Sequence, residues 1–204
     1  YAFYGCTSLK SIHIPESLLA IGNSAFAACT SLTDIDFSEG LSTIYDAAFS
    51  GCTALTNVNF PNTLSSIDNS AFKGCTSLSS LTIPENIYSI EQYAFNECSS
   101  IDTLFWNAKD AQTIESSWFQ NSPITCVIFG DSVEKVPEKV CSDFHALNSV
   151  TFSENITSIG SHAFSNCQSL DSIHFPTNLL TIDSWAFNDC ISLTSVVLPD
   201  NFTN

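Results

Sequence analysis

A period of about 23 residues, within the range of known repeat proteins, runs through almost the whole chain. Phenylalanine recurs at this interval at Phe3, Phe26, Phe49, Phe72 and Phe95, and a cysteine follows each of them by three residues. The pattern returns at Phe164 with Cys167 and at Phe187 with Cys190. A fixed period of this length is typical of a solenoid, in which each coil of the chain packs only against its two neighbours. We therefore expect one elongated repeat domain over residues 1–204.

The spacing within one repeat predicts its local structure. Counted from the Phe as position 0, Cys stands at +3, Leu at +6, apolar residues at +9 and +11, and aliphatic residues at +15 and +18. A polar residue at +10 gives the alternation of a strand with one buried face, as in Leu81-Thr82-Ile83. Proline often follows at +12 and ends the strand, because it has no N–H to donate. We expect one short strand per coil, stacked in parallel, with tight turns or 3₁₀ segments opposite.

Two consecutive coils depart from the period. The interval from Phe95 to Phe119 is one residue longer than the regular spacing, and the next coil, which ends at Cys141, is one residue short. In the coil after that, Cys141 and Phe144 have exchanged the Phe and Cys positions, which keeps the total bulk nearly constant. We expect about nine coils in all, with irregular ones at about 101–144. Because the sequence has no Met and its first and last coils are incomplete, we expect a piece of a longer array, truncated at both ends.

The repeat AFxxCxxLxxIxIPxxLxxI resembles the BspA-like leucine-rich repeat family. Its AFxxC element occurs here as Ala25-Phe26 to Cys29 and as Ala71-Phe72 to Cys75. The resemblance covers residues 1–204 and implies a leucine-rich-repeat-like solenoid. Members of this family are surface or secreted proteins, and some are adhesins for host matrix proteins. The resemblance therefore implies a cell-surface or secreted location and a protein partner, but no particular ligand, because the shared residues are those of the core.

The chain is strongly acidic and poor in cations. Its 21 Asp and Glu residues against 5 Lys give a formal charge of −16, and it contains no Arg. A nucleic-acid partner requires a basic surface, so this composition argues against that class of ligand. No apolar run reaches the ~18 residues that a membrane span needs, so we expect none in this chain.

No motif for catalysis, cofactor binding or metal binding stands out. The chain has 7 Gly and lacks a glycine-rich phosphate loop, a nucleophile elbow and an HExxH pair. His13 neighbours Asp36 across one coil boundary, and we interpret them as a surface ion pair rather than a ligand set. We therefore expect no catalytic residue, no cofactor and no metal, and we do not expect an enzyme.

Eight of the nine cysteines stand within the repeat pattern, at Cys6, Cys29, Cys52, Cys75, Cys98, Cys141, Cys167 and Cys190. Stacked coils would place their Cβ atoms about 4.8 Å apart, farther than the about 3.5–4.5 Å of a disulfide. We expect a ladder of free, buried thiols that behave as small hydrophobic groups. Cys126 lies seven residues after Phe119, but because this coil runs one residue early it takes the place of +8, which the strand alternation turns outward, so it is predicted to be a surface thiol.

Two triplets match the glycosylation pattern N-x-[ST]. They are Asn155-Ile156-Thr157 and Asn201-Phe202-Thr203. In a secreted eukaryotic protein they would be glycan sites. Such triplets are common by chance in a chain this rich in Asn, Ser and Thr, so they carry little information.

The outward residues at +10 form the surface on which a ligand would bind. They are His13, Asp36, Asn59, Thr82, Phe105, Ile128, Thr151, His174 and Val197. Phe105 and Ile128 are apolar neighbours on a face that is otherwise polar, with Cys126 beside them and Thr82 and Thr151 on either side. We add Trp118, which replaces the usual Ala before the Phe, to these ligand-binding candidates. Either the group is an interaction site, or the irregular coils rotate these side chains into a kink where they cover each other.

Three functions follow from this pattern. The first is a non-catalytic adhesion or protein-binding module that binds a host or matrix protein through its strand face. The second is a structural spacer or stalk within a larger surface protein. The third is a carbohydrate-binding face that uses Trp118 and Phe105.

Overall fold

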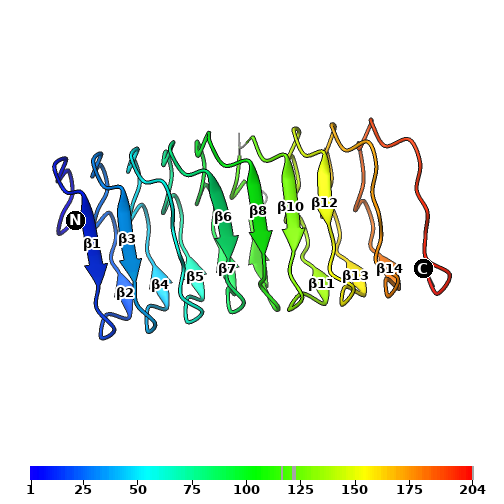
Figure 1. The fold of residues 1–204 in the computed structure, drawn as a ribbon, viewed down its shortest axis with the longest axis horizontal. Helices are drawn as coiled ribbons and strands as arrows, with labels where there is room; N and C mark the ends of the chain where they lie inside the picture. Colours follow the sequence, from blue (N-terminus) through cyan, green and yellow to red (C-terminus); the bar gives the residue numbers. More distant parts are fainter. Residues whose placement is uncertain (116, 121–122, 204) are drawn as a thin grey trace.

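The coils stack side by side into an elongated body. The structure is a computed structural model that describes residues 1–115, 117–120 and 123–203. The two ends of the chain lie at opposite ends of the stack (Figure 1). Every strand pairing is parallel, and no helix occurs among the described residues. The predicted parallel solenoid is confirmed.

The longer strands line up on one side of the body, which we call the first wall (Figure 1). They are β1 (Ser11–Ile14), β3 (Asp34–Phe37), β6 (Ser80–Ile83), β8 (Thr103–Trp106), β10 (Cys126–Phe129) and β12 (Ser149–Thr151). Strand β1 pairs with β3, and β6, β8, β10 and β12 form a four-stranded sheet in sequence order. Strands β1 and β6 end directly before Pro15 and Pro84, as the sequence predicts.

Shorter strands form a second wall. They are β2 (Ala20–Ile21), β4 (Thr43–Ile44), β5 (Ser66–Ile67), β7 (Ser89–Ile90), β9 (Thr113–Ile114), β11 (Lys135–Val136), β13 (Ser158–Ile159) and β14 (Thr181–Ile182). The first five make one sheet and the last three another. The first-wall strand that the sequence predicts for each coil is not formed at residues 57–60, 172–175 and 195–198. The structure instead adds a second ladder, because the backbone around the aliphatic residue at +18 is extended and pairs with the next coil.

The repeat positions form a continuous core between the walls. One regular coil illustrates it, because all of its pattern residues are at most 1% exposed: Phe72, Cys75, Leu78, Leu81, Ile83, Ile87 and Ile90. The Phe rings at position 0 stack from Phe3 to Phe119, with centroid separations of 5.1 Å for Phe3–Phe26 and 5.2 Å for Phe72–Phe95 and interplanar angles of 4° and 3°. The stack is interrupted where Cys141 occupies position 0 and resumes with Phe164 and Phe187. Stacked aromatic pairs of this kind add to the stabilisation that burial gives.

The turn around each Phe makes a third ladder of hydrogen bonds. Ser24, Phe26 and Ala28 donate their N–H groups to Asp46, Ala48 and Ser50 of the next coil over 2.8, 2.8 and 2.7 Å. Every second N–H points along the stack because the residues at −2 and +2 are left-handed. Positive φ occurs at −2 in Ser24, Ala47, Ser70, Tyr93, Lys139, His162 and Trp185, and at +2 in Gly5, Ala28, Gly51, Gly74, Glu97, Asp143, Asn166 and Asp189. Most of these residues are not glycine, so the left-handed backbone at these two positions cannot be predicted from residue type.

Six of the eight repeat cysteines form the predicted buried ladder of free thiols, but Cys190 is half-buried and the prediction was wrong for Cys6, which is exposed in the first coil. Each thiol donates to the carbonyl of position 0 in the preceding coil: Cys29 to Phe3, Cys52 to Phe26, Cys75 to Phe49, Cys98 to Phe72, Cys167 to Cys141 and Cys190 to Phe164, over 3.1–3.3 Å. The thiol therefore satisfies a buried acceptor as well as filling space, which explains why the repeat uses Cys there rather than an aliphatic residue.

The first wall crosses the irregular coils without a defect. Trp106 lies opposite Phe129, which stands one regular period later, in an unbroken four-residue register. Ile114 instead pairs with Ile90 of the preceding coil at a separation one residue longer than the period. The extra residue therefore lies between Trp106 and Ile114. The shortening falls between Phe119 and Ile124, before the chain returns to the first wall. Among the described residues, the second-wall ladder stops between β9 and β11.

Candidate functional site

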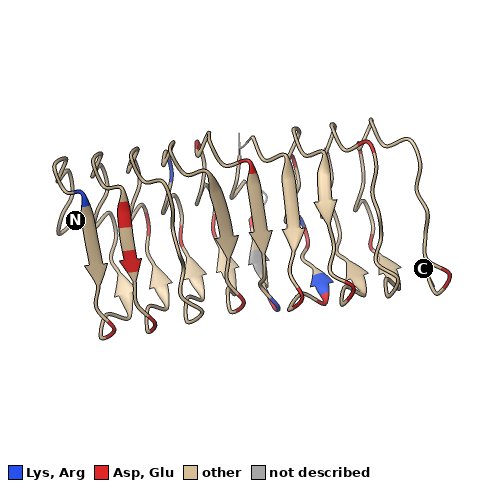
Figure 2. Ribbon diagram, viewed as in Figure 1, with Lys and Arg blue, Asp and Glu red and all other residues tan. Residues whose placement is uncertain are grey.

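Strands β6, β8, β10 and β12 present a neutral surface in a strongly acidic protein. Their sequences, SLTI, TLFW, CVIF and SVT, contain no charged residue. Acidic residues do lie on β3, whereas β10 and β12 carry none (Figure 2). We call the outward side chains of these four strands the neutral patch. Low charge on part of an otherwise charged surface favours contact with another molecule, because less polar surface must be desolvated.

Phe105 and Ile128 lie at the centre of the neutral patch. The register places Phe105 directly opposite both Thr82 and Ile128, and Ile128 opposite Thr151. Four of the six predicted site residues therefore form one row across adjacent strands about 4.8 Å apart. Phe105 is 36% exposed and Ile128 is half-buried. Since β8 and β10 stay in register, the kink that would hide these side chains is not present on this wall.

Cys126 joins the same surface. Its side chain is half-buried and alternates with the buried Val127, so it points outward with Ile128. Its partners in the adjacent strands are Thr103 and Ser149. A second row of small hydroxyl side chains thus runs beside the apolar row, with Cys126 as its one thiol. The placement predicted for Cys126 is confirmed.

Trp118 does not lie on this surface, so the prediction that it is exposed there beside Phe105 and Ile128 was wrong. Its side chain is 1% exposed, and its Nε1–H donates to the carbonyl of Val140 over 3.1 Å. The indole packs edge-on against Trp106 and Phe95, each 6.0 Å away between ring centroids. Position −1 is buried in the other internal coils too, and the small Cys141 at the next Phe position leaves volume for the larger ring. The Cys141–Phe144 exchange in the sequence was the available indication of this burial.

The His13–Asp36 pair lies on the first wall as predicted. His13 Nδ1 is 2.7 Å from Asp36 Oδ2, and the two side chains are 66% and 68% exposed. Such an exposed pair contributes little to stability. No group of three or more His, Cys, Asp and Glu side chains suited to a metal ion occurs in the part of the chain that the structure describes.

Asn155 has a structural partner. Its side-chain Nδ2 donates to the carbonyl of Asp131 in the preceding coil over 2.8 Å. Asn86 and Asn178, which stand at the same repeat position, make the same contact with Asn62 and Glu154. Both Asn155 and Asn201 are exposed. The first glycosylation triplet therefore includes an Asn that the repeat uses to tie neighbouring coils together.

Burial also sets the acidity of the thiols. Desolvation raises the pKa of Cys52 and of Cys98 to about 12, and it holds the pKa of Cys75 and Cys141 well above the ordinary value of 9.0. These thiols stay protonated at neutral pH and are poor nucleophiles. Their role is therefore structural, and the half-buried Cys126 is the reactive candidate on the neutral patch.

No helix that is long and apolar enough to cross a membrane is found within residues 1–115, 117–120 and 123–203.

Comparison with known proteins identifies what this chain is similar to. Residues 1–123 and 112–204 match the model of the BspA type Leucine rich repeat region, in 6 copies. No curated protein matches the chain. A leucine-rich repeat protein from Bacteroides ovatus ATCC 8483 is 26% identical over 95% of this chain and 56% of its own, with a TM-score of 0.66. The leucine-rich repeat protein of T. pallidum is 26% identical over 83% of this chain and 68% of its own, with a TM-score of 0.56. The chain thus spans little more than half of the first of these proteins.

Proposed function

Because the chain belongs to the BspA-type leucine-rich repeat family, we propose that it is a non-catalytic protein-interaction module of a cell-surface or secreted protein. It binds a host or matrix protein through the first wall, and the neutral patch is the point of contact.

The neutral patch is the observation that carries this proposal. Phe105 and Ile128 are adjacent and outward on a sheet whose four strands have no charge, while the chain as a whole carries −16. Exposed apolar residues rimmed by small polar ones are the usual composition of a protein-binding surface. An aromatic residue at its centre supplies the anchor that dominates the binding energy of such surfaces.

The rim supports the same function. Thr82 and Thr151 flank the apolar pair, and Thr103 and Ser149 flank Cys126. Short hydroxyl side chains lose little conformational entropy when a partner covers them. They can also donate to or accept from a partner's backbone. The patch therefore offers an apolar centre with adaptable hydrogen-bonding groups around it.

A paired substitution tests the proposal. Phe105→Ser and Ile128→Ser together are expected to lower capture of immobilised host extracellular-matrix proteins at least about tenfold, because both central anchors are lost. The matched control changes two exposed apolar residues that directly precede second-wall strands β7 and β14, Tyr88→Ser and Leu180→Ser, and should leave capture unchanged. Both proteins must keep the thermal transition of the parent. If the Phe105/Ile128 variant folds and captures as much as the control, the neutral patch is not the contact.

A structural spacer is the second candidate, and the continuity of the first wall supports it. The register between β8 and β10 is preserved even where the repeat length changes, so the stack stays rigid through its irregular coils. A spacer would capture no partner above background, whereas a binding module would. The carbohydrate-binding alternative loses one of its two aromatic residues, since Trp118 is buried.

A further inference from the structure

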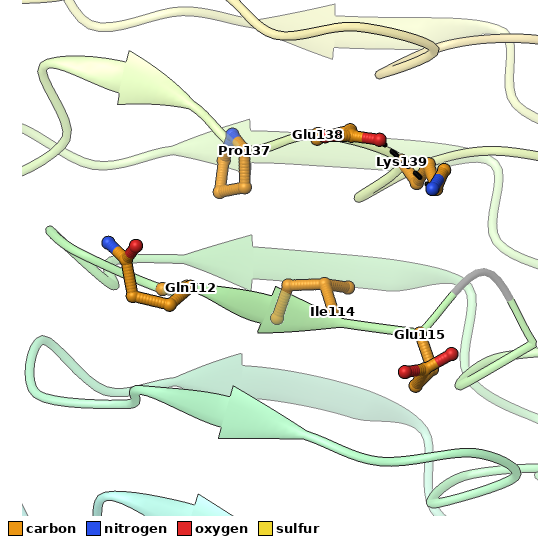
Figure 3. Close-up of a pocket in the computed structure, with 7 residues that line it drawn as sticks. Gln112, Ile114, Glu115, Pro137, Glu138 and Lys139 are labelled. Carbon is orange, nitrogen blue, oxygen red and sulfur yellow. Dashed lines mark ion pairs between the residues drawn. The ribbon is translucent and has the colours of Figure 1, made fainter.

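A cleft opens in the second wall between β9 and β11. Gln112, Ile114 and Glu115 lie on one side of it, and Pro137, Glu138 and Lys139 face them from the other (Figure 3). Its volume here is ≈ 280 Å³, and two adjoining hollows of ≈ 300 and ≈ 440 Å³ extend it past Lys109 and Lys135. These volumes are close to or within the about 300–1,000 Å³ of pockets that hold ligands. The repeat pattern alone gives no indication of this β9–β11 cleft.

Pro137 explains why the ladder stops at the cleft. In other coils the residue after the short strand donates its N–H to the coil before it: Tyr45 to Ile21, Asp68 to Ile44, Glu91 to Ile67, Glu115 to Ile90, Gly160 to Val136 and Asp183 to Ile159. Pro137 occupies this position in its coil and has no N–H. The carbonyl of Ile114 therefore cannot receive the bond that every neighbouring coil makes.

The interruption leaves a free sheet edge on β9. In a parallel sheet, every second residue of a strand directs both its N–H and its C=O towards the same neighbouring strand. Ile114 is such a residue in β9, since it occupies the place of Ile21 and Ile90. It lies at the end of its sheet, and no strand of the described residues pairs with its outer edge. An exposed strand edge is a template on which another extended chain can add.

The charges around the cleft favour a basic occupant. Six carboxylates line the three adjoining hollows, from Asp110, Glu115, Asp131, Glu134, Glu138 and Asp183, against three ammonium groups, from Lys109, Lys135 and Lys139. Two of these cations already have partners. Lys109 lies 2.7 Å from a carboxylate oxygen of Glu85, which is not among the six, and Lys139 lies 2.9 Å from one of Glu138, which is. Five carboxylates and the ammonium group of Lys135 remain once these pairs are set aside. The cleft is thus locally acidic, in a chain whose formal charge is −16.

We propose that the β9–β11 cleft binds an extended, basic segment of a partner polypeptide by strand addition. The segment donates a backbone N–H to the carbonyl of Ile114 and accepts from the Ile114 N–H. Its Lys or Arg side chains meet the surrounding carboxylates. The edge supplies affinity for any extended backbone, and the charges supply the preference for a basic one. This site is separate from the neutral patch on the first wall.

Synthetic peptides of about nine residues provide the probe, with valine and threonine alternating with lysine to favour an extended conformation. The lysine peptide is expected to bind at least about tenfold more tightly than its glutamate counterpart and to slow hydrogen exchange of the Ile114 amide. Methylation of its alternate backbone nitrogens should abolish binding. Equal affinity of the two peptides, an unchanged Ile114 exchange rate, or no binding of the lysine peptide at about 1 mM would overturn the proposal.

Pro137→Gly provides the matching protein variant. Glycine stands at the same repeat position in Gly22 and Gly160, so the coil accommodates it. The new N–H can reach the Ile114 carbonyl from within the chain, so affinity for the lysine peptide should fall about tenfold. Pro15→Gly, in the first coil, is the control and should bind as the parent does. Unchanged affinity in Pro137→Gly would contradict the role of the edge. The Phe105/Ile128 variant should bind the peptide normally, so failure of this proposal is distinct from failure of the proposed function.

Discussion

The thiol of Cys52 donates to the carbonyl oxygen of Phe26 over 3.2 Å, and the backbone N–H of Cys29 donates to the same oxygen over 3.2 Å. One buried acceptor thus receives one donor from its own coil and one from the next. Because this arrangement recurs along the body, the thiol ladder ties each coil to its neighbour at the Phe turn.

Replacing Cys52 by alanine should therefore destabilise the protein beyond the loss of packing. The substitution removes a buried sulfur and leaves the Phe26 carbonyl with one donor. We expect a loss of about 1–2 kcal/mol in the free energy of unfolding. Denaturant titration measures it. Cys126→Ala, on the surface, is the control and should change stability by less than about 0.5 kcal/mol. A loss no larger than that of the control would show that the thiol bond adds nothing.

Alkaline pH should unfold the protein through the same thiols. The pKa of Cys52 is raised from 9.0 to about 12 by desolvation, so the folded state keeps its proton where the unfolded state releases it. The contribution to stability is complete below pH 9.0 and is lost progressively as pH rises towards about 12. Urea titrations at a series of pH values measure this slope. The slope should be smaller in Cys52→Ala, and an identical slope in both proteins would contradict the assignment.

Thiol labelling should divide the cysteines into two classes. Cys6 is exposed and Cys126 and Cys190 are half-buried, while the other six are buried. A thiol reagent at pH 8 is expected to modify the first three rapidly and the remainder only as the protein unfolds, because burial excludes the reagent and suppresses the thiolate. Mass spectrometry of the labelled peptides separates the classes. Rapid labelling of Cys75 in the folded protein would disprove the buried ladder.

Ala28→Gly should stabilise the protein. Ala28 has a φ of 59° at the +2 position, where Gly51 and Gly74 have φ values of 73° and 72°. A Cβ is strained in this region and glycine is not, so we expect a gain of about 0.5–1 kcal/mol. Ala27→Gly, one residue earlier, lacks the positive φ and should instead lose about 1 kcal/mol. Thermal or denaturant unfolding of the two variants checks the opposite signs, and equal losses would contradict the strain.

Trp118→Phe should weaken the fold without weakening partner binding. Phenylalanine fills most of the indole volume but cannot donate to the Val140 carbonyl, so that buried acceptor loses its partner. We expect a loss of about 1–3 kcal/mol. Capture of matrix proteins should remain at the parent level, since the side chain is 1% exposed. Reduced capture by a fully folded Trp118→Phe protein would return Trp118 to the binding surface.

The core and the first wall could be predicted because their residues obey a period. The alternation around Thr82 and the Pro84 that follows it identify the strand, its buried face and its end. Phe105 and Ile128 could be placed by the same count, since the lengthened coil keeps the regular spacing up to Trp106. What periodicity predicts is which residues share a face, and this is the information that the neutral patch requires.

The burial of Trp118, the left-handed turns and the β9–β11 cleft could not be predicted, because they depend on geometry that residue spacing alone does not encode. Trp118 replaces a residue that is buried in other coils, and its ring packs against Phe144 of the next coil, where Cys141 and Phe144 have exchanged positions. The left-handed turns are made by residues such as Glu97 and Lys139, whose types do not indicate positive φ. The β9–β11 cleft depends on one missing N–H at Pro137, which matters only once the donor at that position is known to pair with the coil before it.

The lengthened coil and the shortened coil that follows it have a wider consequence. An insertion after Trp106 is offset by a deletion before Ile124, so the disturbance stays on one side of the body. The two walls can therefore diverge independently. An insertion followed by a deletion of the same length changes one wall and leaves the strand register of the other unchanged. Such paired changes offer a route for grafting new loops onto the array, with the opposite side retained as an unaltered scaffold.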